Sequence, residues 1–202
     1  MQILIATSNV HKLKEITALL PAKMQTGEPF EYISLTDILR LSLPPETGTT
    51  LEQNAIAKAC YAARLAGMWA LSDDTGLEVD FLQGRPGVHT ARYAGEHADA
   101  AANNQKLLQE LTKALPPQRT ARFRTVACLA DPLGNTTCFE GILEGSITSQ
   151  YRGEHGFGYD PIFVVKTTGQ TLAEMTTAEK NQISHRAHAF KQAADYLYRL
   201  KK

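Results

Sequence analysis

Apolar residues follow two spacings along this chain, short unbroken runs and helical repeats. Residues 2–7 form an apolar run typical of a covered strand, and residues 10–20 carry apolar side chains three or four positions apart, as one face of a helix requires. The pattern returns as a helix over residues 51–65 and a strand over residues 67–71. Strands that alternate with helices predict an α/β fold.

The second half of the sequence contains a strong hairpin signal. Residues 120–130 and 136–147 predict two strands, and residues 131–135 supply the proline, glycine and asparagine of a turn. A helix is expected over residues 98–115, closed by two prolines. A last helix is expected to turn Ile183, Ala187, Phe190, Ala194 and Leu197 inward.

Length and charge limit the possible functions. A chain of 202 residues suits one compact domain over residues 1–202. Its 21 basic and 21 acidic residues cancel, which argues against a broad nucleic-acid or membrane footprint. We therefore expect neither nucleic acid nor membrane as a partner, and any anion must be bound by local basic residues.

The cysteines and the N-terminal sequence indicate the cellular compartment of the protein. Cys60, Cys128 and Cys138 have no C-x-x-C spacing, so they suggest neither a disulfide framework nor a zinc site. No basic segment leads into an apolar signal segment, and no apolar run reaches the length of a spanning helix. These observations predict a cytoplasmic protein.

Asp73 and Asp74 stand in the stretch around which we expect the chain to be organised. They follow the apolar run that ends at Leu71 and precede Thr75 and Gly76. Carboxylates at a strand end can hold Mg²⁺, and one of them can take a proton from water. Asp-Asp-Thr-Gly is equally good turn chemistry, so an ordinary surface turn is the alternative.

A polar loop joins the first strand to the first helix. Thr7, Ser8 and Asn9 stand at the mouth of that helix, and Lys12 adds a positive charge in its first turn. A helix N-terminus suits an anionic phosphate. The alternative is an ordinary N-cap on an amphipathic helix.

Residues 153–161 form a glycine-rich segment with two aromatic residues, Phe157 and Tyr159. Glycines let a backbone approach a ligand closely, and aromatic faces can stack on a planar base. The segment is therefore either a base-binding loop or a plain glycine-rich loop.

These segments occur in a fixed order with others: Thr-x-x-x-x-Lys, Glu-Thr-Gly, Ser-Asp-Asp-Thr-Gly-Leu, Pro-Gly-x-x-x-Ala-Arg-Tyr, Phe-Gly-Tyr-Asp-Pro and Ser-His-Arg. Together they resemble the inosine/xanthosine triphosphate pyrophosphatase family over nearly the whole chain. The resemblance implies an elongated mixed sheet flanked by helices, with two lobes, a nucleotide cleft between them, and a homodimer. It also implies Mg²⁺-dependent hydrolysis of the purine nucleoside triphosphates ITP, dITP and XTP to the monophosphate and pyrophosphate.

The resemblance also implies roles for individual residues. The catalytic and metal-binding aspartate falls on Asp74, with Asp73 beside it, and the next substrate contact falls on Thr75. The other implied substrate contacts are the phosphate loop Thr7, Ser8, Asn9, Val10, His11 and Lys12, the base loop Phe157, Gly158, Tyr159 and Asp160, and the late residues Lys180, His185 and Arg186.

One departure from the family pattern concerns the metal. Many relatives carry two acidic residues before Thr-Gly, whereas Pro45 here precedes a single acidic residue, Glu46. Glu46 is therefore the second metal candidate, bridged through Mg²⁺ to Asp74 and to phosphate oxygens. Lys12, Lys58 and Lys180 are expected to neutralise the rest of the phosphate charge.

Two other functions fit parts of the pattern. One is a septum-type nucleotide pyrophosphatase that acts on other nucleotides, against which the Phe-Gly-Tyr-Asp and Ser-His-Arg motifs speak. The other is a non-catalytic nucleotide-binding protein. The presence of Glu46, Asp73 and Asp74 favours turnover.

Overall fold

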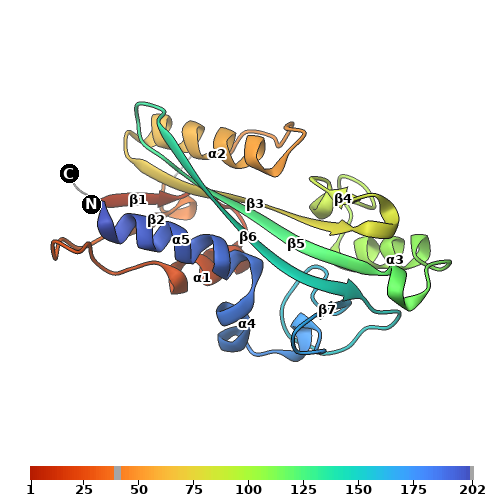
Figure 1. Cartoon of the computed structure of the whole chain (residues 1–202). Helices are drawn as coiled ribbons and strands as arrows, with labels where there is room; N and C mark the ends of the chain where they lie inside the picture. The colour runs from red at the N-terminus through yellow and green to blue at the C-terminus, as the bar shows by residue number, and fades with distance from the viewer. Residues whose placement is uncertain (39–41, 201–202) are drawn as a thin grey trace. The chain divides into compact units, whose positions relative to one another are not determined.

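The computed structural model describes residues 1–38 and 42–200. These residues contain a seven-stranded sheet in the order β2-β1-β3-β5-β6-β7, with β4 paired to β3 (Figure 1). The strands are β1 (Gln2–Ile5), β2 (Glu31–Ser34), β3 (Trp69–Val79), β4 (Pro86–Gly87), β5 (Thr120–Ala130), β6 (Thr136–Ile147) and β7 (Phe163–Val165). The helices are α1 (Val10–Leu19), α2 (Leu51–Ala66), α3 (Ala100–Glu110), α4 (Thr177–Ile183) and α5 (His185–Arg199).

The sheet is mixed, as predicted. β1 pairs in parallel with β2 and with β3, whereas β3 pairs antiparallel with β4 and β6 pairs antiparallel with β7. The predicted hairpin is confirmed at both of its strands, because β5 and β6 begin and end where the sequence pattern places them.

The chain divides into two compact units. Unit 1 comprises residues 1–74, 125–141 and 186–202, and unit 2 comprises residues 75–124 and 142–185. Strands β3, β5 and β6 contribute residues to both units. The nucleotide cleft expected between two lobes stays a prediction.

Unit 1 packs helices on both faces of its part of the sheet (Figure 1). On one face, Ile16 of α1 and Phe190 of α5 pack in one core with Ile3, Ile5 and Leu71. The other face belongs to α2, whose inward positions are mostly alanines that lose all contact with solvent: Ala55, Ala59, Ala62 and Ala63. Small side chains let this helix lie close to the sheet.

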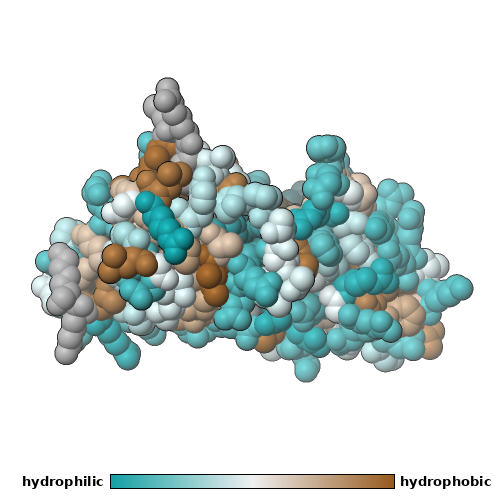
Figure 2. Space-filling view, turned by 90° about the horizontal axis from the view of Figure 1, so that it is seen from above, coloured by the Kyte–Doolittle hydropathy of each residue, from teal (hydrophilic) through white to brown (hydrophobic). Residues whose placement is uncertain are grey.

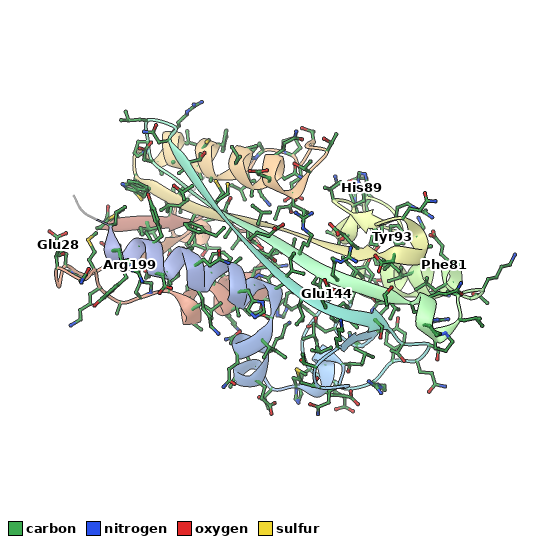
Figure 3. The ribbon with its side chains drawn as sticks, viewed as in Figure 1. Glu28, Phe81, His89, Tyr93, Glu144 and Arg199 are labelled. Carbon is green, nitrogen blue, oxygen red and sulfur yellow. The ribbon has the colours of Figure 1, made fainter. Side chains whose placement is uncertain are left out.

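Unit 2 has a core of its own. Phe163 of β7 packs on Phe123 of β5, with ring centroids 4.7 Å apart. Tyr93 also belongs to this core, beside α3 (Figure 3). Its hydroxyl donates a hydrogen bond to Glu110 at 2.6 Å, and the Lys106 ammonium lies 4.5 Å from its ring centroid. Burial first, and then the Glu110 carboxylate, raise the pKa of Tyr93 to about 12.

Three predicted elements are wrong in extent. β3 does not end before Asp73 but continues to Val79, so Asp-Asp-Thr-Gly is strand and not turn. α3 ends at Glu110, well before the two prolines. The last helix is interrupted at Ser184, whose extended backbone (φ −67°, ψ 155°) separates α4 from α5.

Figure 2 looks down on the face that carries α2. Apolar residues on this face form separate groups among hydrophilic ones. Two large apolar side chains of α2 are exposed, Tyr61 and Leu65. No helix within the described ranges is long and apolar enough to cross a membrane.

Candidate active site

Two neighbouring carboxylates of β3 have different surroundings. β1 ends its pairing with β3 at Ile5, opposite Leu71, so Asp73 and Asp74 lie beyond the carboxyl end of β1. Successive side chains of a strand point to opposite faces. Asp73 therefore faces α1 and α5, while Asp74 faces α2.

Asp74 is held by two residues that lie one turn apart on α2. The Asn54 side-chain amide donates a 2.9 Å hydrogen bond to one carboxylate oxygen, and the Lys58 ammonium lies 3.6 Å from the other. The same ammonium donates a hydrogen bond to Glu46. Lys58 thus joins two carboxylates that are distant in sequence.

The pKa values of this group reflect burial and charge together. Burial raises the pKa of Asp74, and Glu46 raises it further, while Lys58 and Asn54 only partly oppose the shift. Burial alone would lower the pKa of Lys58, but Asp74, Asp73 and Glu46 outweigh it, so this pKa is raised. The ammonium is therefore held in its charged form between carboxylates.

Asp73 forms ion pairs with residues of α1 and α5. Its carboxylate lies 3.0 Å from the Lys12 ammonium and 3.5 Å from the Arg186 guanidinium. Arg186 also donates a hydrogen bond to Glu15 of α1, and its side chain is 2% exposed. Although burial alone would raise the pKa of Asp73, Lys12, Arg186 and Lys58 together hold it below its usual range.

The partners of Asp73 and Asp74 lie on different helices. Asp73 pairs with Lys12 of α1 and Arg186 of α5, whereas Asp74 accepts a hydrogen bond from Asn54 of α2. Asp73 thus fixes two cations, and its place in a metal site shared with Asp74 stays a prediction.

The loop before α1 contains a well-formed N-cap. Asn9 Oδ1 accepts hydrogen bonds from the backbone N–H groups of His11 and Lys12, at 2.9 and 3.2 Å. Thr7 Oγ1 accepts one from the N–H of Asn9. The capping alternative is therefore confirmed for Asn9, and Ser8, Val10 and His11 are exposed around it. The phosphate contact of residues 7–12 stays a prediction.

The glycine-rich loop of unit 2 is organised by the Asp160 carboxylate. This carboxylate accepts hydrogen bonds from the Phe157 N–H at 2.9 Å and from the Lys180 ammonium at 2.6 Å. The same ammonium lies 4.6 Å from the Phe157 ring centroid. Gly156 has φ +78°, and a Cβ at this position would overlap the Asp160 carboxylate. Lys180 of α4 thus holds the base loop, and its expected contact with the phosphates stays a prediction.

Two further hydrogen bonds attach this loop to other parts of unit 2. The Tyr159 hydroxyl donates to the carbonyl of Thr90 at 3.0 Å. The Asn104 side-chain amide donates to the carbonyl of Gly158, also at 3.0 Å. Asn104 is buried on α3 and was not among the predicted site residues.

The remaining predicted residues of unit 2 are Thr75 and His185. Thr75 is partly buried on β3, directly after Asp74. His185 is buried, and its ring stacks on Phe123 with centroids 4.7 Å apart.

The donor set around Lys58 is compatible with a small divalent cation. Glu46 and Asp74 supply oxygen ligands, the type that Mg²⁺ prefers, and both already converge on one positive charge. No cluster of three or more His, Cys, Asp or Glu residues suited to a metal occurs in residues 1–38 and 42–200. Mg²⁺ usually binds through one or two carboxylates together with substrate phosphates, so two carboxylates are sufficient.

Comparison with known proteins places this arrangement in a family. Residues 3–196 match the Ham1 family. The chain belongs to the Ham1 family. It is 57% identical over 190 residues to a protein of Elusimicrobium minutum named dITP/XTP pyrophosphatase, covering 94% of this chain and 96% of that one. A Bacillus subtilis protein of the same name is 45% identical over 194 residues, covering 96% of each chain.

Solved structures of Ham1 proteins share the fold. The structure of a Ham1 protein from Coxiella burnetii superposes with a TM-score of 0.87 at 38% identity and covers 98% of each chain. The α/β fold of this Ham1 family member is therefore confirmed.

Three site residues of this Ham1 chain were missed by sequence reasoning: Glu15, Asn54 and Asn104. Two of them had a local signal. Asn54 and Lys58 lie four residues apart beside Ala55 and Ala59, a polar pair on an apolar helix face, and Glu15 follows Lys12 by three positions.

Proposed function

We propose that this chain hydrolyses deaminated purine nucleoside triphosphates, namely ITP, dITP and XTP, to the monophosphate and pyrophosphate. Membership of the Ham1 family and the name of its relatives, dITP/XTP pyrophosphatase, support this substrate class. The single observation that carries the proposal is the buried residue Asp74, 5% exposed, whose carboxylate is held by Asn54 and Lys58 with Glu46 alongside.

We assign the proton transfer to Asp74. Hydrolysis requires that a water molecule lose a proton as it attacks phosphorus, and a positioned carboxylate can accept it. Asn54 and Lys58 hold Asp74 from one helix, so its orientation is fixed before the substrate arrives.

Glu46 and Asp74 would hold a magnesium ion. When bound, Mg²⁺ would neutralise phosphate charge and orient the phosphate oxygens. Lys58 lies between the same two carboxylates and limits their repulsion. Its ammonium would then be available to the anionic phosphates, together with Lys12.

The phosphate loop and Asp73 act together in this proposal. The phosphate loop would surround the phosphate tail with its backbone and with short polar side chains. Its residues before Lys12 are Thr7, Ser8, Asn9, Val10 and His11. Lys12 supplies the full charge, and Asp73 fixes its position at 3.0 Å. Thr75 follows on β3 as the next substrate contact.

The base loop would select the purine. Phe157 would stack on the base, with Gly158 and Tyr159 shaping the loop and Asp160, Lys180, His185 and Arg186 at the edge of the base. Hypoxanthine and xanthine carry a 6-oxo acceptor where adenine carries an amino donor. A hydrogen-bond donor at that edge leaves adenine with an unpaired buried group, which can discriminate by roughly 10⁴-fold.

The decisive experiment uses the full chain with Mg²⁺ and either ITP, XTP or ATP. We expect pyrophosphate from ITP and XTP and much slower turnover of ATP. Orthophosphate as the product would overturn the assigned bond. Binding of ITP without turnover would indicate a non-catalytic nucleotide-binding protein. Turnover of pyrimidine nucleotides faster than that of ITP would indicate a septum-type pyrophosphatase. Neither alternative finds support in the names of the relatives.

We also propose a cytoplasmic homodimer that binds neither nucleic acid nor membrane. The family resemblance supports the dimer. The chain has 21 basic and 21 acidic residues, and this balanced charge argues against nucleic acid or a membrane as a partner. Sedimentation of the purified chain tests the dimer, and a monomer at micromolar concentration would contradict it.

A further inference from the structure

Three thiols lie in unit 1, and none of them is among the residues assigned to the reaction. Cys60 lies on α2, Cys128 on β5 and Cys138 on β6, and all three are free. Cys128 is fully buried, while Cys60 and Cys138 are partly exposed. Sequence spacing gave them no role, because the relevant proximity arises only when the hairpin forms.

The register of the hairpin brings two of these cysteines face to face. The N–H of Asp131 bonds to the carbonyl of Asn135 at one end of the hairpin. The N–H of Ile147 bonds to the carbonyl of Arg119 at the other end. Both contacts pair residues whose numbers have the same sum, so the register does not slip between them. The same register places Cys128 opposite Cys138.

The type of pair matters for a disulfide. Hydrogen-bonded and non-hydrogen-bonded pairs alternate along antiparallel strands. Cys128 is an odd number of residues from both Asp131 and Arg119, so it occupies a non-hydrogen-bonded pair with Cys138. The Cα atoms of such pairs lie about 4.5 Å apart, within the range of about 4.4 to 6.8 Å that disulfides span.

The two cysteine side chains influence each other. The Cys128 thiol itself donates a hydrogen bond to the Leu129 carbonyl at 3.9 Å. The Cys138 side chain beside it, followed by burial, raises the pKa of Cys128. The same interaction lowers the pKa of Cys138. Burial, opposed by Arg64 and assisted by the nearby Cys138, raises the pKa of the Cys60 thiol. Cys138 is therefore the partly exposed thiol best suited to react first.

We propose that Cys128 and Cys138 form a reversible oxidation site, which peroxides convert to a cross-strand disulfide while Cys60 stays a thiol. The site is independent of the proposed nucleotide chemistry. Its reactive class of ligand is a small peroxide that reaches Cys138 from solvent.

The reaction balances in two steps. The Cys138 thiolate attacks a peroxide oxygen, so that an S–O bond forms, the O–O bond breaks and the leaving hydroxide is protonated to water. The Cys128 sulfur then attacks the Cys138 sulfur; the S–S bond forms, the S–O bond breaks, and the oxygen leaves as water with the Cys128 proton. Two thiols lose two electrons to one peroxide, and a dithiol reductant reverses the change.

The full-length protein tests the site by mass spectrometry. It is treated with hydrogen peroxide, its remaining thiols are alkylated, and peptides are mapped without reduction. We expect one alkylated thiol, at Cys60, and a peptide pair linked through Cys128 and Cys138 that a dithiol reductant separates. The matched control Cys60→Ser should keep this linkage, whereas Cys138→Ser and Cys128→Ser should lose it.

Two outcomes would overturn the proposal. One is a linkage between Cys60 and Cys138 in the wild-type protein. The other is conversion of Cys138 to sulfinic acid while Cys128 remains alkylatable. Because both are read on the wild-type chain, the test does not depend on whether Cys128→Ser folds.

Discussion

Asp73 and Asp74 are consecutive residues whose carboxylates lie on opposite faces of β3. Asp73 pairs with Lys12 of α1 at 3.0 Å, and Asp74 accepts a hydrogen bond from Asn54 of α2 at 2.9 Å. Two adjacent residues of β3 therefore have different roles: Asp73 positions cations, and Asp74 can accept a proton. Substitutions at the two positions should have different kinetic signatures.

The first prediction concerns Asp74→Asn. The amide keeps the shape of the side chain and can still accept the hydrogen bond from Asn54, but it cannot take a proton. We expect kcat for ITP to fall by about 10³-fold, with nucleotide binding largely retained, because general-base catalysis contributes on this scale. Steady-state kinetics and calorimetric titration with ITP measure the two effects.

Asp73→Asn is the matched control for this variant. It weakens the hold on Lys12 and Arg186, so we expect a raised KM and lower stability with a smaller loss of kcat. Equal losses of kcat in both variants, with unchanged KM, would contradict the separation of roles.

The second prediction concerns the buried pair of Lys180 and Asp160. Their side chains are 5% and 6% exposed and 2.6 Å apart. Lys180→Met leaves a buried carboxylate without its cation, and we expect the free energy of unfolding to fall by about 3–5 kcal/mol. The double variant Lys180→Met, Asp160→Asn should lose less than the sum of the single changes. Denaturant unfolding gives all four values.

An exposed ion pair provides the comparison. Arg92 lies 3.6 Å from Glu96, whose side chain is 79% exposed. Arg92→Ala should cost less than about 1 kcal/mol. If Lys180→Met costs no more than Arg92→Ala, the buried pair does not stabilise the base loop.

The third prediction separates two adjacent asparagines of α3. Asn104 donates to the carbonyl of Gly158, whereas Asn103 donates to the carbonyl of Ala91 and accepts from the N–H of Ala94. Asn104→Ala should raise KM for ITP about tenfold to a hundredfold, because small displacements of a binding loop are costly.

Asn103→Ala serves as the control for loss of a buried amide. We expect it to lower stability by about 1–3 kcal/mol, as unpaired backbone groups do, with little change in KM. A similar rise of KM in both variants would mean that α3 acts only through general stability.

The fourth prediction concerns the pH dependence of α4. Its N-cap Thr176 forms a capping box with Glu179. Hydrogen bonds from the backbone and the side chain of Thr176 lower the pKa of Glu179 from its ordinary value of 4.5. Because the pKa is lower in the folded state, ionised Glu179 stabilises the helix at pH values above its ordinary pKa. This contribution is lost as the pH falls through the folded-state pKa.

Amide exchange along α4 measures this effect against Glu179→Gln. At about pH 6 the wild-type helix should exchange more slowly than the variant, and this difference should shrink as the pH falls below 4.5, the ordinary pKa of a glutamate. A difference that persists unchanged at the lower pH would show that the charge of Glu179 is not responsible.

The success and failure of sequence reasoning have physical causes. The hairpin was predicted in full because its turn depends on local residues, with Asp131 accepting hydrogen bonds from the N–H groups of Leu133 and Asn135. β3 was cut short because Asp-Asp-Thr-Gly favours turns locally. Pairing with β4, at Leu77 and Glu78, extends the strand and overrides that preference.

The site shows the same division. Residue types and their order indicated the phosphate loop, Asp74 and the base loop as site segments, and these roles stay predictions. The partners of those residues were not indicated, because Asn54 meets Asp74 across 20 positions and Arg186 meets Glu15 across 171. Contacts of this kind depend on how helices pack on the sheet, which no local pattern encodes.

Gly156 limits how this protein can vary. A side chain there would occupy the volume of the carboxylate that holds Lys180 and the Phe157 backbone, and the local φ of +78° already disfavours any residue other than glycine. A saturation library at position 156 selected for function should therefore return glycine, even though nearby exposed positions tolerate exchange.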